Sequence, residues 1–217
     1  MTVTHQLHSI SILLQFFMFF GVIAASISGA IRAIESKMDI TGAILLAFIT
    51  ANAGGTIRDI ILGSDIFWIR DQIYIWLTCI IGALTFIVIY YKGHMLGNRK
   101  INYILIVTDA MGIAAFSLAG VEKSLTFGQN HAVAVIMGVW TAIGGGIIAD
   151  VISNRVPFVF TKELFYITVS FFGSICYLLL ANFDISRTIA SIIAATFMIG
   201  LRLLSVRFKW NLPKIDT

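Results

Sequence analysis

The segment Ala53-Gly-Gly-Thr-Ile-Arg-Asp59 returns 91 residues later as Gly144-Gly-Gly-Ile-Ile-Ala-Asp150. The same offset, without a gap, also pairs residues far from this motif: Gly21 with Gly112, Ser26 with Ser117, Gly29 with Gly120, Phe67 with Phe158 and Gly82 with Gly173. An internal repeat dictates the architecture of a chain, because each copy folds as the same structural unit. The sequence therefore predicts two copies of one unit, and it points to the repeated glycine motif as the functional site.

The composition excludes a water-soluble globule. The chain is 59% hydrophobic and 12% charged, with a mean hydropathy of +0.94, whereas soluble domains carry about 25% charged residues. Each apolar segment is close to the ~20 residues that a membrane-spanning helix needs, and the segments fall at 10–31, 41–62, 73–91, 101–121, 132–153, 164–181 and 187–204. We expect an all-α polytopic membrane protein with seven transmembrane helices in one domain, 1–217. The first segment lacks the basic flank of a signal peptide, so we keep it in the fold.

The basic residues predict the orientation. Loops on the side of the N-terminus hold Arg58, Arg70, Lys123 and Arg187. The opposite loops hold Arg32, Lys37, Lys92, Arg99, Lys100, Arg155, Lys162, Arg202, Arg207, Lys209 and Lys214. Cytoplasmic loops carry the excess of Lys and Arg. The N-terminus is therefore expected outside and the C-terminus in the cytoplasm.

The number of spans in each copy makes the repeat an inverted one. Three spans fall in 10–91 and three in 101–182, so the second copy must enter the membrane from the opposite side. The two copies are then related by an axis in the membrane plane, as in many transport proteins. The helix at 187–204 is an addition to this plan.

The glycine motifs predict helix breaks in spans two and five. Each glycine costs about 1 kcal/mol in a helix, and neighbouring glycines favour bending. At membrane depth, a broken helix persists only where its freed backbone faces protein or water. Two symmetric breaks would therefore line a hydrophilic path near the midplane, formed by Gly54, Gly55, Gly144, Gly145 and Gly146. The alternative is close helix packing through small residues.

Charged residues beside these motifs are candidates for a role in a pore. A charge near the centre of a span costs roughly 2.5–3.5 kcal/mol, so it usually faces a cavity or a partner. Arg58, Asp59 and Asp150 lie one helical turn after the glycines. They could instead reach the interface by snorkelling. A third possibility is that Arg58 pairs with one of the aspartates and locks the two helices together.

Two further charged positions lie in span four. Asp109 is about nine residues into this span and should be solvated, hydrogen-bonded or paired. Lys123 closes the same helix and is the repeat counterpart of Arg32. We interpret Lys123 and Arg32 mainly as interfacial anchors, with Lys123 also a candidate for pore charge or gating.

An enzyme is not expected. The sequence has no phosphate-binding glycine loop followed by Lys and Ser or Thr, and its histidines are scattered without metal-ligand spacing. Cys79 and Cys176 lie inside spans and have no partner at such spacing. We therefore expect no cofactor, no fixed metal and no nucleic-acid partner.

The motifs resemble the prokaryotic branch of the TRIC (trimeric intracellular cation) channels, a group also catalogued under a bacterial glycine-transporter domain. The resemblance covers nearly the whole chain and is carried by 54–59, 108–112, 144–150, 154–157 and the tail 207–213. It implies homotrimers in which each protomer has an hourglass pore between spans two and five, kinked at the glycines. It also implies that K⁺ passes, with Na⁺ less favoured, across a bacterial inner membrane.

Two departures from the family pattern limit which residue roles of the family can be assigned to this chain. The bacterial pattern commonly has Arg before the second motif's Asp, where this chain has Ala149. The eukaryotic channels carry a gating, lipid-binding lysine early in span four, where this chain has Asp109. Arg58 would therefore act without a symmetric arginine, and control by lipid phosphates at Asp109 is not expected.

Three functions remain open from the residues themselves. In a K⁺-permeable channel, Asp59, Asp109 and Asp150 attract cations and glycine carbonyls coordinate them weakly. In a secondary transporter for a glycine-like zwitterion, helix N-termini and Arg58 hold the carboxylate of the substrate. In a structural trimer, the glycines only pack. The family resemblance favours the channel, with K⁺, Na⁺ and membrane lipids as its partners.

Overall fold

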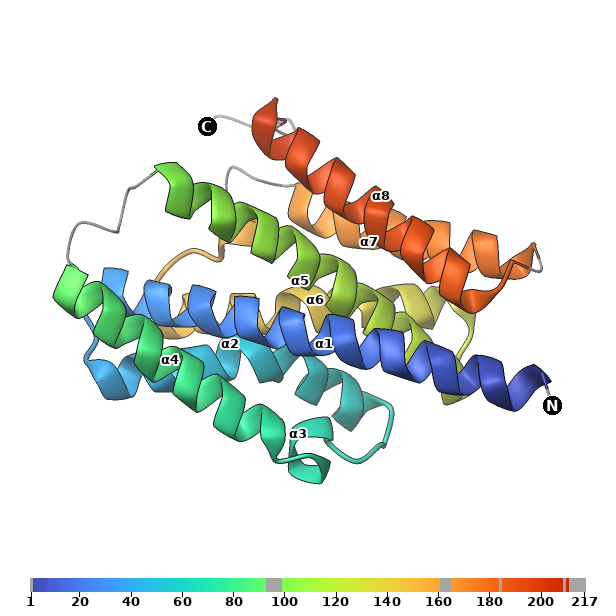
Figure 1. Cartoon of the computed structure of the whole chain (residues 1–217), viewed down its shortest axis with the longest axis horizontal. Coiled ribbons are helices and arrows are strands. Elements are labelled where there is room, and N and C mark those ends of the chain that lie inside the picture. The colour runs from blue at the N-terminus through green and yellow to red at the C-terminus, as the bar shows by residue number, and fades with distance from the viewer. Residues whose placement is uncertain (1, 93–98, 161–164, 184, 209, 211–217) are drawn as a thin grey trace.

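The protein is all-helical in the part of the chain that the computed structural model describes, residues 2–92, 99–160, 165–183, 185–208 and 210. These ranges form eight α-helices and one 3₁₀ turn (Figure 1): α1 (Thr2–Glu35), α2 (Ile40–Ile61), α3 (Phe67–Arg70), α4 (Ile73–Lys92), α5 (Arg99–Thr126), α6 (His131–Ile152), η1 (Phe158–Phe160), α7 (Phe165–Asn182) and α8 (Arg187–Arg207). Lys162, Lys209, Lys214 and the tail 211–213 lie outside the described residues.

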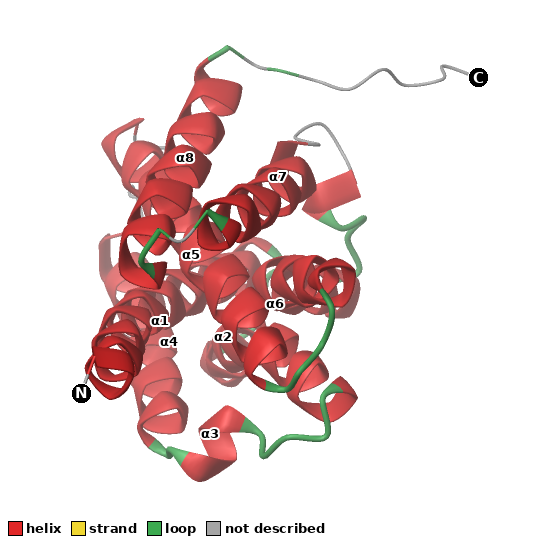
Figure 2. Cartoon of the chain, turned by 90° about the vertical axis from the view of Figure 1, so that its right-hand side faces the viewer, coloured by secondary structure: helices red, strands yellow, loops and turns green. Residues whose placement is uncertain are grey.

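Four helices make the centre of the bundle. Helix α1 packs on α2 and α5, and α6 packs on both α2 and α5. Helix α4 covers α1 and α2 on one side, while α7 and α8 cover α5 and α6 on the other (Figures 1 and 2). The short helix α3, in a segment expected to be a plain loop, leads into α4. The candidate residues on α2, α5 and α6 therefore lie in the middle of the molecule.

Within the described ranges, five helices are long and apolar enough to cross a membrane. They are Met18–Glu35 in α1, and α2, α4, α6 and α8, while Tyr166–Asn182 is a shorter apolar helix. Half of the α6 span is buried inside the protein, against 11% of the α4 span. The chain is therefore a helical membrane protein in which α6 is central and α4 is peripheral. The structure supports five of the seven spans predicted from the sequence.

Local geometry recurs at the 91-residue spacing. Asp39 caps the N-terminus of helix α2, where its Oδ1 accepts the Gly42 N–H at 2.8 Å, and Asn130 caps α6, where its Oδ1 accepts the Val133 N–H at 2.9 Å. Such a cap satisfies one of the free N–H groups in the first turn. The described residues with positive φ are Lys37, Gly63, Gly128 and Asn154. They too are two pairs at this spacing, Lys37 with Gly128 and Gly63 with Asn154.

The glycine motifs lie inside continuous helices, so the predicted breaks are absent from this structure. Both α2 and α6 are helical along their whole length. A Cβ added to Gly54 would lie 2.5 Å from the Thr141 carbonyl oxygen, and one added to Gly145 would overlap the Thr50 carbonyl. A Cβ on Gly144 would lie 3.2 Å from the Cα of Gly54. These glycines therefore let the backbones of α2 and α6 touch where they cross, which is the packing alternative.

Candidate functional site

Two ion pairs join the first helix of each repeat unit to the second helix of the other. Arg32 on α1 approaches Asp150 on α6, with Nε 3.2 Å from Oδ1. Lys123 on α5 approaches Asp59 on α2, with Nζ 2.7 Å from Oδ1. Arg32 corresponds to Lys123, and Asp150 to Asp59, at the spacing of 91. The interpretation of Arg32 and Lys123 as interfacial anchors is therefore incomplete, because each cation has a carboxylate partner.

Asp59 is the centre of a buried charged cluster, which we call the Asp59 cluster: Arg58, Asp59, Phe67 and Lys123. The Asp59 side chain is completely buried. Its Oδ1 accepts from Arg58, with Nη2 at 2.6 Å and Nε at 2.7 Å, and from Lys123; its Oδ2 accepts the Phe67 N–H at 3.0 Å. Arg58 thus pairs with an aspartate, but with its own neighbour on α2. It does not lock α2 to α6; Lys123 instead ties α5 to α2.

The Phe67 ring packs over the second glycine of the first motif. A Cβ added to Gly55 would lie 2.6 Å from the Phe67 ring, so the ring covers the glycine directly. The Arg58 guanidinium lies 5.9 Å from the ring centroid, within the range of a cation–π interaction. Trp68 Nε1 donates to Thr56 Oγ1 at 2.8 Å, which also holds α3 against α2. Sequence reasoning missed this role of Phe67, although its match with Phe158 was an available signal.

The opposite end holds a cavity of about 340 Å³, which we call the Asp109 cavity. It is lined by Arg32, Asp109, Asp150, Tyr166 and Arg202, among others. A smaller recess of about 30 Å³ shares several of these residues and reaches Gly146, Thr50 and Phe116. This volume is enough for about two water molecules. The cavity therefore extends from the charged end of the bundle toward the crossing of α2 and α6.

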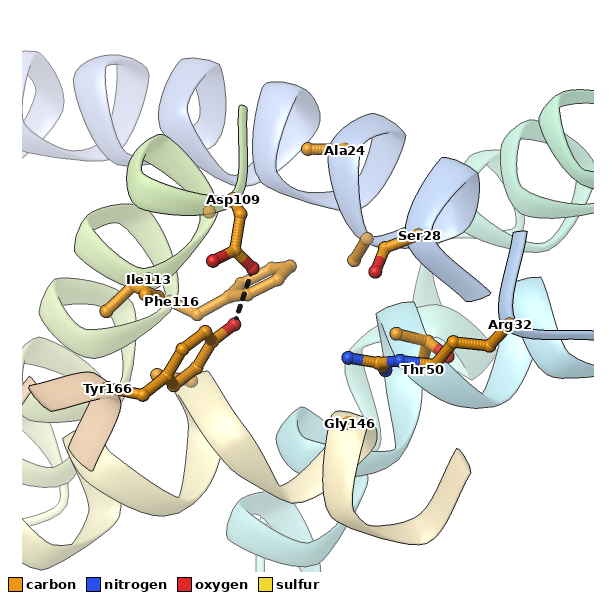
Figure 3. A pocket seen from close by; sticks show the side chains of 12 residues that line it. Ala24, Ser28, Arg32, Thr50, Asp109, Ile113, Phe116, Gly146 and Tyr166 are labelled. Atoms are coloured by element: carbon orange, nitrogen blue, oxygen red, sulfur yellow. Dashed lines mark hydrogen bonds between the residues drawn. The ribbon is translucent and has the colours of Figure 1, made fainter. Parts of the chain in front are cut away.

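Opposite charges face each other across the recess (Figure 3). Asp109 Oδ1 accepts from Tyr166 OH at 2.7 Å, and its Oδ2 is 3.4 Å from Arg202 Nη2. Arg32 points in from the other side, where a Cβ on Gly146 would lie 3.4 Å from its Nη1. Asp109 is thus hydrogen-bonded and ion-paired, as expected for a carboxylate about nine residues into a membrane span. Tyr166 and Arg202 were not found from the sequence, because they belong to α7 and α8 and carry no local motif.

The two ends of the molecule are not equivalent. Gly146 lines the open recess, whereas its counterpart Gly55 is covered by Phe67. Arg58 corresponds to Ala149, which is fully buried among apolar residues. The sequence mismatch at this position therefore coincides with a structural difference between the Gly55 end, where Phe67 covers the glycine, and the Gly146 end, where the glycine lines a recess. In the described residues, no three or more His, Cys, Asp or Glu side chains come together as a metal site.

Known proteins resemble the chain along most of its length. The family model described as "Glycine transporter" matches twice, at residues 15–91 and 106–182. A UPF0126 membrane protein of Vibrio cholerae is 38% identical over 197 residues, covering 89% of this chain and 79% of that protein. The UPF0126 inner membrane protein YadS of Escherichia coli K12 is 31% identical, covering 89% and 91%.

Solved structures of cation channels share the fold. A structure solved to explain conductance through TRIC cation channels superposes with a TM-score of 0.84 at 32% identity, covering 94% of this chain and 97% of that one. The TRIC trimeric intracellular cation channel orthologue from Rhodobacter sphaeroides gives a TM-score of 0.81 at 28% identity, covering 91% and 99%. These relatives are membrane proteins and channels, so the expectation that the protein is not an enzyme is confirmed. The chain belongs to the UPF0126 family described as "Glycine transporter", the prokaryotic family of the TRIC cation channels.

Proposed function

We propose that the protein is a channel for monovalent cations, permeable to K⁺. The observation that carries this proposal is the similarity to solved TRIC cation channels over 94% of the chain. The charged Asp109 cavity, which reaches the crossing of α2 and α6, supports it independently. The carboxylates at the cavity wall offer oxygen atoms that a passing cation can contact, while Arg32, Arg155 and Arg202 balance their charge.

The conduction path that we propose lies within one protomer, between α2 and α6. It starts at the Asp109 cavity, passes Gly146 and continues along the glycine crossing to Gly55. In this conformation the path is closed twice, by the contact of Gly54 with α6 and by Phe67 over Gly55. Opening therefore requires α2 and α6 to separate and α3 to leave Gly55. Bending at the glycines would achieve the first step, since these positions have no side chain to resist it.

The architecture proposed for this channel is a pair of inverted repeats, 10–91 and 101–182, with an added last helix in a seven-span chain. The double match of the family model, the paired positive-φ residues and the reciprocal ion pairs support it. We place the N-terminus outside and the C-terminus in the cytoplasm of a bacterial inner membrane. A homotrimer is proposed because a solved neighbour is described as trimeric.

Purified protein in planar bilayers and liposomes tests the function. Unitary currents whose reversal potential follows the K⁺ gradient are expected. Saturable glycine uptake without unitary current would instead support a carrier for a small zwitterion, and neither signal in folded protein would support a structural trimer.

A bulky side chain in the recess tests the path. Gly146→Leu points its side chain toward the flexible end of Arg32, so it should abolish the current and leave the oligomer intact. Gly200→Leu is the matched control, because a Cβ at Gly200 meets no atom of the described residues within 4 Å. Unchanged conductance in Gly146→Leu would remove this glycine from the path.

A further inference from the structure

A guanidinium group lies beside each of the two glycines that end the proposed crossing path. A Cβ added to Gly146 would lie 3.4 Å from Arg32 Nη1, and one added to Gly55 would lie 3.5 Å from Arg58 Nη2. The two glycines are equivalent in the repeat, but the two arginines are not, since Arg32 is on α1 and Arg58 is on α2. The same positive charge is therefore supplied at both places by different positions of the sequence.

Arg32 is the arginine that faces open space. It lines both the Asp109 cavity and the recess of about 30 Å³. Its Nε is 3.2 Å from Asp150 Oδ1, whereas its buried Nη1 has no hydrogen-bond partner among the described residues. The guanidinium points into the recess from α1, on the side opposite Asp109 (Figure 3). Because the recess has room for about two water molecules, a cation inside it is largely dehydrated and lies beside this guanidinium.

The charges around the recess balance. Its described lining has one cationic side chain, Arg32, and one carboxylate, Asp109. The wider cavity has three arginines and three carboxylates, joined in the pairs Arg32–Asp150, Arg202–Asp109 and Arg155–Glu35. The described walls therefore offer a dehydrated cation polar atoms but no net negative charge.

A neutral wall treats monovalent and divalent cations differently. The cost of removing water from an ion rises with the square of its charge, whereas its attraction to a wall charge rises only in proportion to the charge. Divalent cations accordingly bind where several oxygen ligands, carboxylates among them, surround the ion. A divalent cation thus needs an excess of carboxylates to enter so small a recess, and K⁺ needs much less.

We propose that Arg32 makes the path selective for monovalent over divalent cations. Its charge cancels the negative charge that would otherwise repay the dehydration of a divalent ion in the recess. This inference rests on the proposed function, because it concerns which cations the same path carries. Arg58 places a second guanidinium at Gly55, but Asp59 holds it in a buried ion pair, so Arg32 is the residue at which the charge can be tested.

Planar bilayers with K⁺ on one side and Ca²⁺ on the other test the proposal, because the reversal potential gives the permeability ratio of Ca²⁺ to K⁺. Arg32→Gln keeps a polar side chain and removes the charge, which leaves the carboxylates in excess. At an effective dielectric constant of about 20, a unit charge within about 8 Å favours a divalent over a monovalent cation by at least about tenfold. The permeability ratio should therefore rise by at least about tenfold in Arg32→Gln.

Arg155→Gln is the matched comparison. It removes the same charge from the same cavity, but Arg155 lies outside the recess and pairs with Glu35, where the two side chains are 34% and 47% exposed. Water and salt screen a charge at such a place, so the ratio should change by at most about threefold. Arg32→Lys keeps the charge and should keep the selectivity of the wild type.

Three results would overturn the proposal: an unchanged ratio in Arg32→Gln, an equal rise in Arg155→Gln, or a loss of selectivity in Arg32→Lys. A wild type without K⁺ current would contradict the proposed function instead. Thermal unfolding then still tests the role of Arg32, since Ca²⁺ should raise the melting temperature of Arg32→Gln and not that of the wild type. An equal response of these two proteins to Ca²⁺ would also overturn the inference.

Discussion

Replacing Asp59 with asparagine removes the carboxylate that Arg58 and Lys123 share. The Arg58 side chain is 2% exposed and Asp59 is not exposed, so water cannot screen the Arg58 charge that remains, whereas Lys123 is 25% exposed. Breaking a buried ion pair by removing one partner costs about 3–5 kcal/mol. A chain of this size loses about 2–4 °C of melting temperature per kcal/mol. Asp59→Asn should therefore melt about 6–20 °C below the wild type in a thermal unfolding assay of the purified protein.

Two comparisons sharpen this prediction. Asp150→Asn should lose less stability, because Arg32 is 18% exposed and lines a cavity that water can enter. Adding Lys123→Met to Asp59→Asn should restore part of the loss, since one stranded cation is gone. Exposed Asp65→Asn serves as the control and should stay within about 0.5 kcal/mol. A melting temperature for Asp59→Asn within 3 °C of the wild type, or a larger fall in Asp150→Asn, would refute the reasoning.

Two further substitutions test the glycine crossing and its cover. Phe67→Ala removes one of the two proposed closures, so the open probability in single-channel recordings should rise; an unchanged value would mean that Phe67 does not limit opening. Gly145→Ala places a methyl group on the Thr50 carbonyl and should cost about 1–3 kcal/mol in thermal unfolding. Gly200→Ala, with open space around it, should be neutral or stabilising by up to about 1 kcal/mol. Equal stability of the two alanine variants would contradict the close backbone contact.

The helical membrane fold could be predicted because composition and periodicity act along the chain. The 91-residue offset also placed positions that later proved equivalent in local geometry, such as Asp39 and Asn130 at the starts of α2 and α6. The sequence identified the glycines as the central feature. It did not predict that the helices that contain them are continuous. A glycine can either bend a helix or admit a neighbouring backbone, and only the position of Thr141 next to Gly54 decides between the two.

Long-range partners were the part of the site that the sequence could not provide. Asp109 was expected to need a partner, yet Tyr166 is 57 residues away and Arg202 is 93 residues away on a helix outside the repeat. The partners of Asp59 and Asp150 were easier to predict from the sequence. Once the repeat was aligned, the cations Arg32 and Lys123 stood at one common position, and the two aspartates at another. Pairing these two positions across the halves would have predicted both ion pairs.

The reciprocal ion pairs suggest how such a chain could arise from a duplicated three-helix unit. Within one half, the cation ends the first helix and the carboxylate ends the second, so the two lie at opposite ends of the bundle. These two charges therefore cannot pair with each other within one half, although Arg58 contacts Asp59 within the first half. Two identical copies would neutralise each other only if one were upside down relative to the other, with Arg32 of one meeting the aspartate of its mate. The electrostatics of a lone three-helix unit thus already favour a self-complementary antiparallel dimer, which gene duplication and fusion would make permanent.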